Sequence, residues 1–186
     1  MLSKQPIVGY LTCATCYKIE KRTMMTTDTT NMCSLAEAPI LHKKSFQELT
    51  TDELYELLRV RSEVFVVGQN CVYQDLDGDD QKSIHLWLTV AGKVVALARV
   101  CPAGTHMKEI SIGRVITIAT ERGKGYGKQI VLHAIDAAVE HFGAQLIDIE
   151  AQEYAKGFYE GVGFRQSSDT FVLEGIPHIK MTWKRF

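Results

Sequence analysis

The chain lacks the long apolar run that a membrane-spanning helix requires. None of its uninterrupted hydrophobic stretches approaches the roughly 18 residues that cross a bilayer, so no membrane partner is expected. It also lacks an excess of charge of either sign, because 21 Lys and Arg face 22 Asp and Glu, for a net charge of -1. Without a global attraction to phosphate backbones, no nucleic-acid partner is expected either.

The cysteines lack a framework of pairs. There are five among the 186 residues, at irregular spacings, which favours a reducing compartment and predicts a cytoplasmic protein. Cys13 and Cys16 have the spacing of half a zinc site or of a redox pair, but no second Cys/His pair follows at finger spacing. We therefore expect no metal.

The beginning of the chain differs from the rest. Residues 23–33 are polar, rich in Thr and without periodicity, which is typical of a segment that buries too little surface to order itself. We interpret residues 1–38 as a flexible N-terminal extension, with a targeting role as an alternative, and residues 39–186 as one domain.

From residue 39 onward, strand and helix patterns alternate, which indicates a mixed α/β domain. A first helix is expected to begin at the N-cap candidates over 50–53 and to run to Arg61 or a few residues past it. Further helices are expected over 154–160 and between the glycines at 123–127 and Gly143, while 63–69 is either a short helix or an irregular turn. The strand over 110–118 is β-branched on both faces and is expected near the middle of the sheet. The strands are expected over 40–49, 84–90, 93–100, 110–118 and 146–149, with two more within 164–186.

A glycine-rich loop stands between the strand over 110–118 and the longest helix. It runs from Arg122 to Gly127 and reads RGKGYG. Glycine lets a backbone approach a ligand closely, and the first turn of the next helix presents unpaired N–H groups at the positive end of its dipole. With the charges of Arg122, Lys124 and Lys128 nearby, these groups predict a site for a phosphate or diphosphate.

Two common phosphate-binding motifs do not fit this loop. A P-loop requires glycine five residues before its Gly-Lys pair and Ser or Thr after it, whereas Arg122 and Gln129 hold those places. A dinucleotide fingerprint requires a third glycine where Lys128 stands. An NTPase and a dinucleotide-binding enzyme are therefore both disfavoured.

Arg122, Gly125 and Gly127 fit the pattern Arg/Gln-x-x-Gly-x-Gly/Ala. With this loop, and with Phe158-Tyr159 followed by Gly163-Phe164, the chain resembles the GCN5-related N-acetyltransferases (GNAT). That resemblance implies a mostly antiparallel central sheet, splayed near its middle, with flanking helices. Further motifs resemble the ElaA-type branch of the family; they are Phe65 to Cys71, Tyr73 to Asp80, Ile112 to Val115 and Gly175 to Ile179.

The resemblance also implies acetyl-CoA as acyl donor. The glycine loop would hold its diphosphate, the strand at Val115 would face its pantetheine arm, and Gln152 stands where many members have Asn. The implied cofactor-binding residues are Val115, Ile116, Thr117, Arg122, Gly123, Lys124, Gly125, Tyr126, Gly127, Lys128 and Gln152.

Acetylation of an amine by a thioester requires a deprotonated amine, a stabilised oxyanion and a proton for the leaving thiolate. Direct attack requires no cysteine nucleophile, only alignment of the bound reactants. The N–H of Val115 is the oxyanion donor if its strand splays from 146–149. Tyr159 stands at the family's position for protonating the thiolate, and a phenol with a reference pKa of about 10 suits that role. A core tyrosine is the alternative.

The general base is left open. Glu150 at a strand end, Glu109, Asp77 or a water chain could each serve. His178 follows a Gly-Ile-Pro turn near the expected acceptor end, and its reference pKa of about 6.5 suits proton transfer. A buried structural histidine is the alternative for His178. His85, within a strand, is either structural or a wall of the acceptor pocket.

The acidic loop over 75–80 does not fit a calcium loop, since its glycine falls at the fourth position and Leu86 stands at the twelfth. It is either a solvated turn or a set of carboxylates that attracts a cationic amine to the acceptor entrance. The residues predicted to contact the acceptor are Asp77, His85 and His178.

These observations predict an acetyl-CoA-dependent N-acetyltransferase that acts on a primary amine by direct attack in a ternary complex. The acceptor is expected to be a small molecule with an amino group, or a peptide Lys, and the protein a monomer or homodimer. The alternative is a non-catalytic acyl-CoA-binding sensor or interaction module, which the lack of an unmistakable base leaves open.

Overall fold

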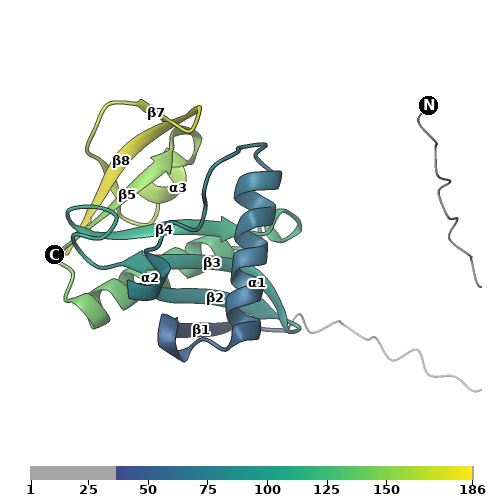
Figure 1. Cartoon of the computed structure of the whole chain (residues 1–186). Coiled ribbons are helices and arrows are strands. Elements are labelled where there is room, and N and C mark those ends of the chain that lie inside the picture. The colour runs from purple at the N-terminus through teal and green to yellow at the C-terminus, as the bar shows by residue number, and fades with distance from the viewer. Residues whose placement is uncertain (1–36, 186) are drawn as a thin grey trace, which may run out of the picture. The chain divides into compact units, whose positions relative to one another are not determined.

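The computed structural model describes residues 37–185, and the predictions for residues 1–36 lie outside them. An eight-stranded sheet has the order β1-β2-β3-β4-β5-β8-β6, with β7 paired to β8 (Figure 1). The strands are β1 (Ile40–Ser45), β2 (Ile84–Val90), β3 (Lys93–Cys101), β4 (Ile110–Thr117), β5 (Leu146–Gln152), β6 (Arg165–Gln166), β7 (Phe171–Leu173) and β8 (Ile176–Lys184). The helices are α1 (Thr51–Arg61), α2 (Tyr126–Phe142) and α3 (Lys156–Glu160), with short 3-10 turns at Phe46–Glu48, Asp80–Lys82, Ala119–Glu121 and Glu153–Ala155.

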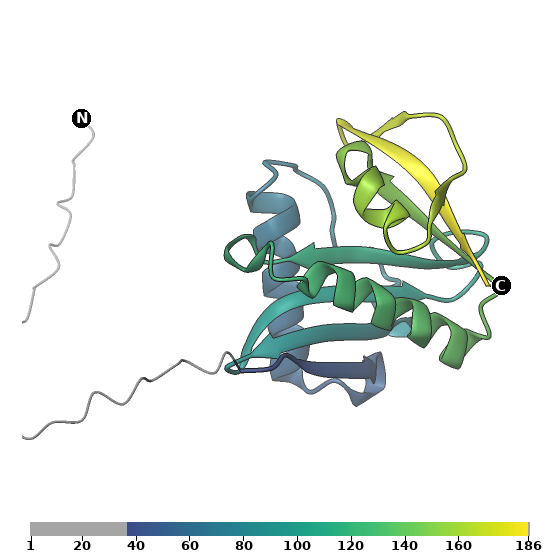
Figure 2. The same ribbon diagram turned by 180° about the vertical axis from the view of Figure 1, so that it is seen from behind.

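The sheet is antiparallel except where β4 meets β5. These two strands run parallel and share only the pairs Ile110–Ile147 and Ser111–Asp148. Beyond these pairs they diverge, and Figures 1 and 2 show β5 and β8 turning away from β4. The mostly antiparallel sheet, splayed near its middle, is therefore confirmed, as is the central place of β4.

Helices cover both faces of the sheet. Figure 1 shows α1 in front of β2 and β3, and Figure 2 shows α2 on the opposite face. On the α2 face, Val131 and Ile135 are buried among apolar residues of the sheet. On the α1 face, Leu57 and Val60 pack with Trp87 and other strand residues. Two apolar layers thus fix the sheet, and with it the diverging strands, between the helices.

The start of α1 follows from its sequence. Thr50 accepts a hydrogen bond from Glu53 N (3.2 Å), and the Glu53 carboxylate accepts one from Thr50 N (2.9 Å). This capping box satisfies two otherwise unpaired amides. The helix continues into a π-helical turn over Ser62–Val67, so the helical alternative for this segment is the correct one.

The largest differences from the prediction concern the first strand, the strand after α2 and the last part of the chain. The first strand ends at Ser45 rather than at residue 49, because the Glu48 carboxylate accepts hydrogen bonds from Ser45 N (2.8 Å) and Ser45 Oγ (2.7 Å) and closes a 3-10 turn. The strand that begins at Leu146 extends to Gln152, since β8 pairs along its whole length. The last part of the chain holds three strands instead of two, the short β6 and β7 and the longer β8.

Within the described part of the chain, no helix is both long enough and apolar enough to cross a membrane.

Candidate functional site

A cavity of about 870 Å³ opens where β4 and β5 diverge. This volume lies in the range of small-molecule and cofactor sites. Its walls come from β4, the start of α2, β5, α3, the segment after α1 and the β7–β8 hairpin. The cavity therefore joins segments that are far apart in the sequence.

One end of the cavity is the glycine loop before α2. Gly123 (φ 80°) and Gly125 (φ 86°) have left-handed backbones, which glycine adopts without strain. Gly125 caps α2, and the hydrogen bond from Gln129 N to Gly125 O (3.1 Å) closes the first turn, so the amides of residues 126–128 have no helical acceptor. No acidic residue lies in this turn to compete for them.

Only some of the cationic side chains of the loop face the cavity. Arg122 and Lys128 line the cavity, and Arg122 Nε also donates to Thr117 O (3.4 Å), which ties the loop to the end of β4. The side chain of Lys124 instead binds Glu121 Oε2 at 2.8 Å and is not among the lining residues. The loop thus brings two cations and a helix N-terminus to the cavity, an arrangement suited to an anion.

Gly127 lets α2 approach the end of β4. A Cβ at this position would lie 2.9 Å from Thr117 Oγ1 and 3.6 Å from the Phe158 ring, and the first distance is shorter than real Cβ contacts. Glycine here is thus a packing requirement rather than a backbone one.

Gly127→Ala is expected to lower the melting temperature by about 2–10 °C, because overpacking costs about 1–3 kcal/mol in a domain of this size. Gly157→Ala is the matched control: a Cβ there meets no atom within 4 Å in the part of the chain that the structure describes, and the melting temperature should not fall. Thermal unfolding followed by circular dichroism compares the two variants. Equal melting temperatures for Gly127→Ala and the unchanged protein would contradict the packing argument.

The predicted strand residues Val115, Ile116 and Thr117 line the middle of the cavity. Val115 has a register partner on neither β3 nor β5. In this position a main-chain N–H can face a ligand instead of a neighbouring strand, as the oxyanion role requires.

Tyr159 lines the cavity from α3. Its ring packs edge-on against Phe158 and Phe164, with centroid distances of 5.0 and 5.8 Å. Burial, with a smaller contribution from Tyr154, raises the pKa of the Tyr159 phenol above its usual value. The phenol is therefore protonated at neutral pH and has a proton to donate.

Glu150 and His178 also line the cavity, from β5 and β8. Glu150 Oε1 lies 3.7 Å from Lys180 Nζ, and Glu150 Oε2 lies 4.0 Å from His106 Nε2. His178 is buried, and its Nδ1 lies 2.8 Å from Ile176 O. Because a carbonyl only accepts, Nδ1 carries the proton, and Nε2 of the neutral ring keeps a lone pair.

Asp77 lines the cavity, but its carboxylate is not free. Arg99 Nη2 and Nη1 donate to its two oxygens at 2.6 and 2.8 Å. Burial alone would raise the pKa of Asp77, but the hydrogen bond and charge of Arg99 hold that pKa well below its usual value. Asp77 thus serves an ion-pair network, which leaves little charge to attract a cationic amine.

His85, predicted to be either structural or a wall of the acceptor pocket, is not among the residues that line the cavity. Its ring is buried, and Nε2 lies 3.0 Å from Asp80 O. Burial lowers the pKa of His85. Its structural alternative fits this position.

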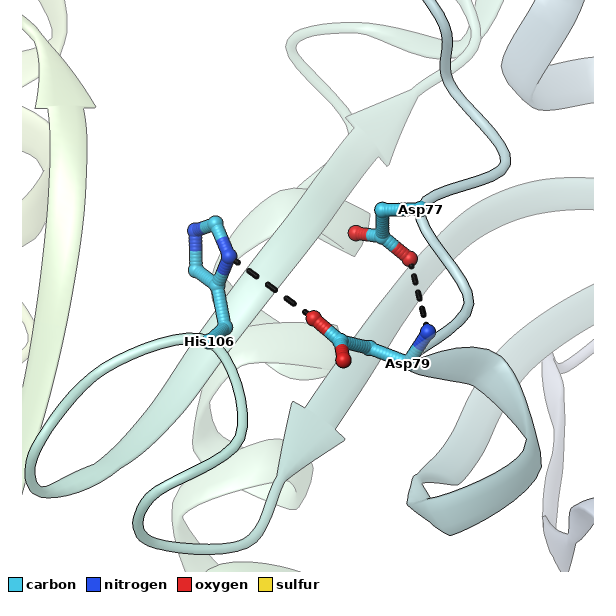
Figure 3. A group of neighbouring side chains, drawn as sticks. All are labelled: Asp77, Asp79 and His106. Carbon is cyan, nitrogen blue, oxygen red and sulfur yellow. Dashed lines mark hydrogen bonds and ion pairs between the residues drawn. The ribbon is translucent and has the colours of Figure 1, made fainter.

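Asp77, Asp79 and His106 form a cluster near the cavity (Figure 3). One ligand atom from each lies within 4.8 Å of the others, and His106 Nδ1 is 3.9 Å from Asp79 Oδ2. Such a trio could hold a cation, but Arg99 already neutralises Asp77. The cluster therefore carries no assignment of a metal.

Two contacts that the sequence did not indicate link the segment after α1 to the opposite wall. Gln152 Nε2 donates to Gln69 Oε1 (3.3 Å), and Cys71 Sγ donates to Glu174 O (3.6 Å). All four residues line the cavity. Gln152 was predicted to face the cofactor, and it lines the cavity. Its hydrogen bond to Gln69 could not be predicted, because no local pattern shows that these two segments lie close together.

The sequence and the fold are similar to those of known proteins. Residues 47–185 match the sequence model of the acetyltransferase (GNAT) domain. A UPF0039 protein of Schizosaccharomyces pombe is 39% identical over 140 residues, which are 74% of this chain and 92% of that protein. ElaA of Escherichia coli K12 is 35% identical over 136 residues, 72% of this chain and 89% of that protein.

Solved structures agree. The crystal structure of Escherichia coli ElaA has a TM-score of 0.74 at 32% identity and covers 79% of this chain and 100% of that one. An acyl-CoA N-acyltransferase from Pseudomonas aeruginosa has a TM-score of 0.73 at 33% identity, over 78% of this chain and 99% of that one. The chain therefore belongs to the GNAT acetyltransferase family.

Proposed function

We propose that this protein transfers an acetyl group from acetyl-CoA to a primary amine by direct attack within a ternary complex. The observation that carries the proposal is one cavity that runs from a helix N-terminus with two cations, Arg122 and Lys128, to Tyr159 and Glu150. Membership of the GNAT family supports the use of an acyl-CoA in general. That the transferred acyl group is acetyl is part of our proposal.

The loop end of the cavity would bind the donor. The free amides at the start of α2 and the charges of Arg122 and Lys128 suit a diphosphate. The main chain at Val115 would accept the pantetheine arm and stabilise the oxyanion. Acetyl-CoA supplies an activated thioester, whose carbonyl carbon the amine attacks.

In the reaction, the amine nitrogen forms a bond to the carbonyl carbon while the bond from that carbon to sulfur breaks. The amine gives its proton to a base, and the leaving thiolate takes one from the Tyr159 hydroxyl. Glu150 is the base of this proposal, directly or through a water, because among residues 37–185 neither of its oxygens has an ion-pair partner closer than 3.7 Å. His178 Nε2 is the second candidate.

The acceptor of this proposal is a small molecule with a primary amino group, or a peptide Lys. The name of the Pseudomonas aeruginosa protein, an acyl-CoA N-acyltransferase, supports transfer to nitrogen. We place the reaction in the cytoplasm, which the free thiols of Cys71 and Cys101 favour. A monomer and a homodimer both fit the proposal.

The test is incubation of the full chain with acetyl-CoA and a panel of amines, amino acids and Lys peptides, while free thiol is followed. Acceptor-dependent thiol release, with a mass gain of one acetyl group on the acceptor, is the expected result. If calorimetry shows acetyl-CoA binding but no acceptor causes thiol release, the proposed enzyme is contradicted and the protein is instead an acyl-CoA-binding sensor.

A further inference from the structure

β4 contains a bulge beside the cavity. Leu97 of β3 pairs with Ile116 and Arg99 pairs with Gly113, so two residues of β4, Arg114 and Val115, face one residue of β3. Such a bulge bends its strand and increases the local twist. Here the bulge begins at Arg114, three residues after Ser111, which forms the last pair between β4 and β5, and it lies where the cavity opens.

The bulge requires a costly backbone conformation. Arg114 has φ 51°, and among the described strands it is the only residue other than glycine with a positive φ. A residue with a Cβ is strained in this region and stays there only when its surroundings hold it.

The Arg114 side chain is held by the acidic loop. Its Nη2 donates to Asp75 O (2.9 Å) and Asp77 Oδ2 (3.1 Å). Its Nε lies 2.7 Å from Asp75 Oδ1, a close ion pair in which the N–H direction misses the oxygen. Three contacts on one guanidinium therefore fix the strained residue to the loop.

The loop is in turn anchored to two other elements. Arg61 at the end of α1 donates to Asp75 Oδ2 (2.9 Å) and Asp80 Oδ1 (2.7 Å). Arg99 of β3 binds both oxygens of Asp77 and also donates to Asp80 Oδ1 (2.9 Å). The side chains of Arg61 and Arg99 are only 3% and 2% exposed, so these ion pairs are shielded from water.

We propose that these six residues, the bulge clamp, are positioning residues that keep the gap between β4 and β5 open and Val115 directed at it before any ligand binds. The clamp consists of Arg61, Asp75, Asp77, Asp80, Arg99 and Arg114. It gives the acidic loop a role that neither a solvated turn nor an acceptor entrance describes. For its effect on acyl transfer, this inference rests on the proposed function.

A comparison of Arg114→Ala with Arg114→Gly tests whether the side chain of Arg114 holds the strained backbone or only forms an ion pair. Both remove the guanidinium, but glycine keeps the left-handed backbone without a clamp, whereas alanine does not. In the full chain without ligand, Arg114→Ala should speed hydrogen exchange over residues 112–118, and Arg114→Gly should speed it less. In calorimetry, Arg114→Ala should weaken acetyl-CoA binding by about tenfold, and Arg114→Gly should restore most of the affinity.

Arg59→Ala is the matched control, because Arg59 is an exposed residue of α1 that forms ion pairs with Glu56 and Glu63 away from the acidic loop. It should change neither readout. If Arg114→Ala does not fold, Asp77→Asn is the second variant. It removes the charge of Asp77, which binds Arg114 and Arg99, without changing the size of the side chain, and it should likewise speed hydrogen exchange over residues 112–118.

Two results would overturn the clamp: exchange and affinity in Arg114→Ala equal to those of the unchanged protein, or an Arg114→Gly variant that binds acetyl-CoA no better than Arg114→Ala. If the unchanged protein binds no acetyl-CoA, the proposed function fails, and the exchange comparison still decides on the clamp.

Discussion

Gly125→Val is expected to weaken acetyl-CoA binding by at least about 100-fold, the largest effect on affinity in this site. Gly125 caps α2 with a left-handed backbone, φ 86°, which a β-branched residue adopts only with strain. A Cβ there meets no atom of the described residues within 4 Å, so the added side chain would project into the space proposed for the diphosphate. Calorimetry of acetyl-CoA binding measures the loss.

Gly143→Val is the matched control for this strain. Gly143 caps the other end of α2, also with a left-handed backbone (φ 66°), and a Cβ there is equally free of neighbours. This variant should lose stability but keep its acetyl-CoA affinity. Equal affinities for Gly125→Val and Gly143→Val would show that the diphosphate does not bind at the glycine loop.

Tyr159→Phe is expected to lower kcat by about 100-fold or more, the usual contribution of a positioned acid. The ring contacts with Phe158 and Phe164 remain, so the fold and the acetyl-CoA affinity should be kept. Only the proton for the leaving thiolate is removed. Steady-state turnover with the best acceptor of the panel, beside calorimetry for acetyl-CoA, separates the two quantities.

Tyr55→Phe removes an exposed hydroxyl from α1 and should leave turnover unchanged. Because burial raises the pKa of Tyr159, the phenol stays protonated through the neutral range, and the loss in Tyr159→Phe should be similar from about pH 7 to 9. Turnover of Tyr159→Phe equal to that of the unchanged protein at several pH values would remove the proposed acid.

The parts of the fold that could be predicted are those with a local cause. The capping residues Thr50 and Glu53 mark the start of α1, and the glycines before Tyr126 mark the start of α2. The β-branched pattern around Ile116 indicates the central strand. The glycine loop could be assigned to an anion because helix N-termini bind anions wherever they are accessible.

The ion pair of Asp77 could not be predicted, because its partner Arg99 is distant in sequence, and the two alternatives for His85 could not be separated, because its burial depends on how the acidic loop folds. Arg99 neutralises Asp77 across 22 positions, and burial under the acidic loop removes His85 from the cavity. The bulge at Arg114 is likewise invisible locally, since an arginine within a β-branched strand indicates a regular strand. The contact between Gln69 and Gln152 spans 83 positions and has no sequence signal.

The most direct test of the account is a titration of the full chain with CoA, followed by backbone amide shifts in nuclear magnetic resonance. If the diphosphate binds at the glycine loop and the pantetheine arm along β4, the largest shifts are expected at Gly123, at Gly125 to Lys128 and at Val115 to Thr117. Saturable binding whose shifts fall elsewhere, or the absence of any binding, would contradict it.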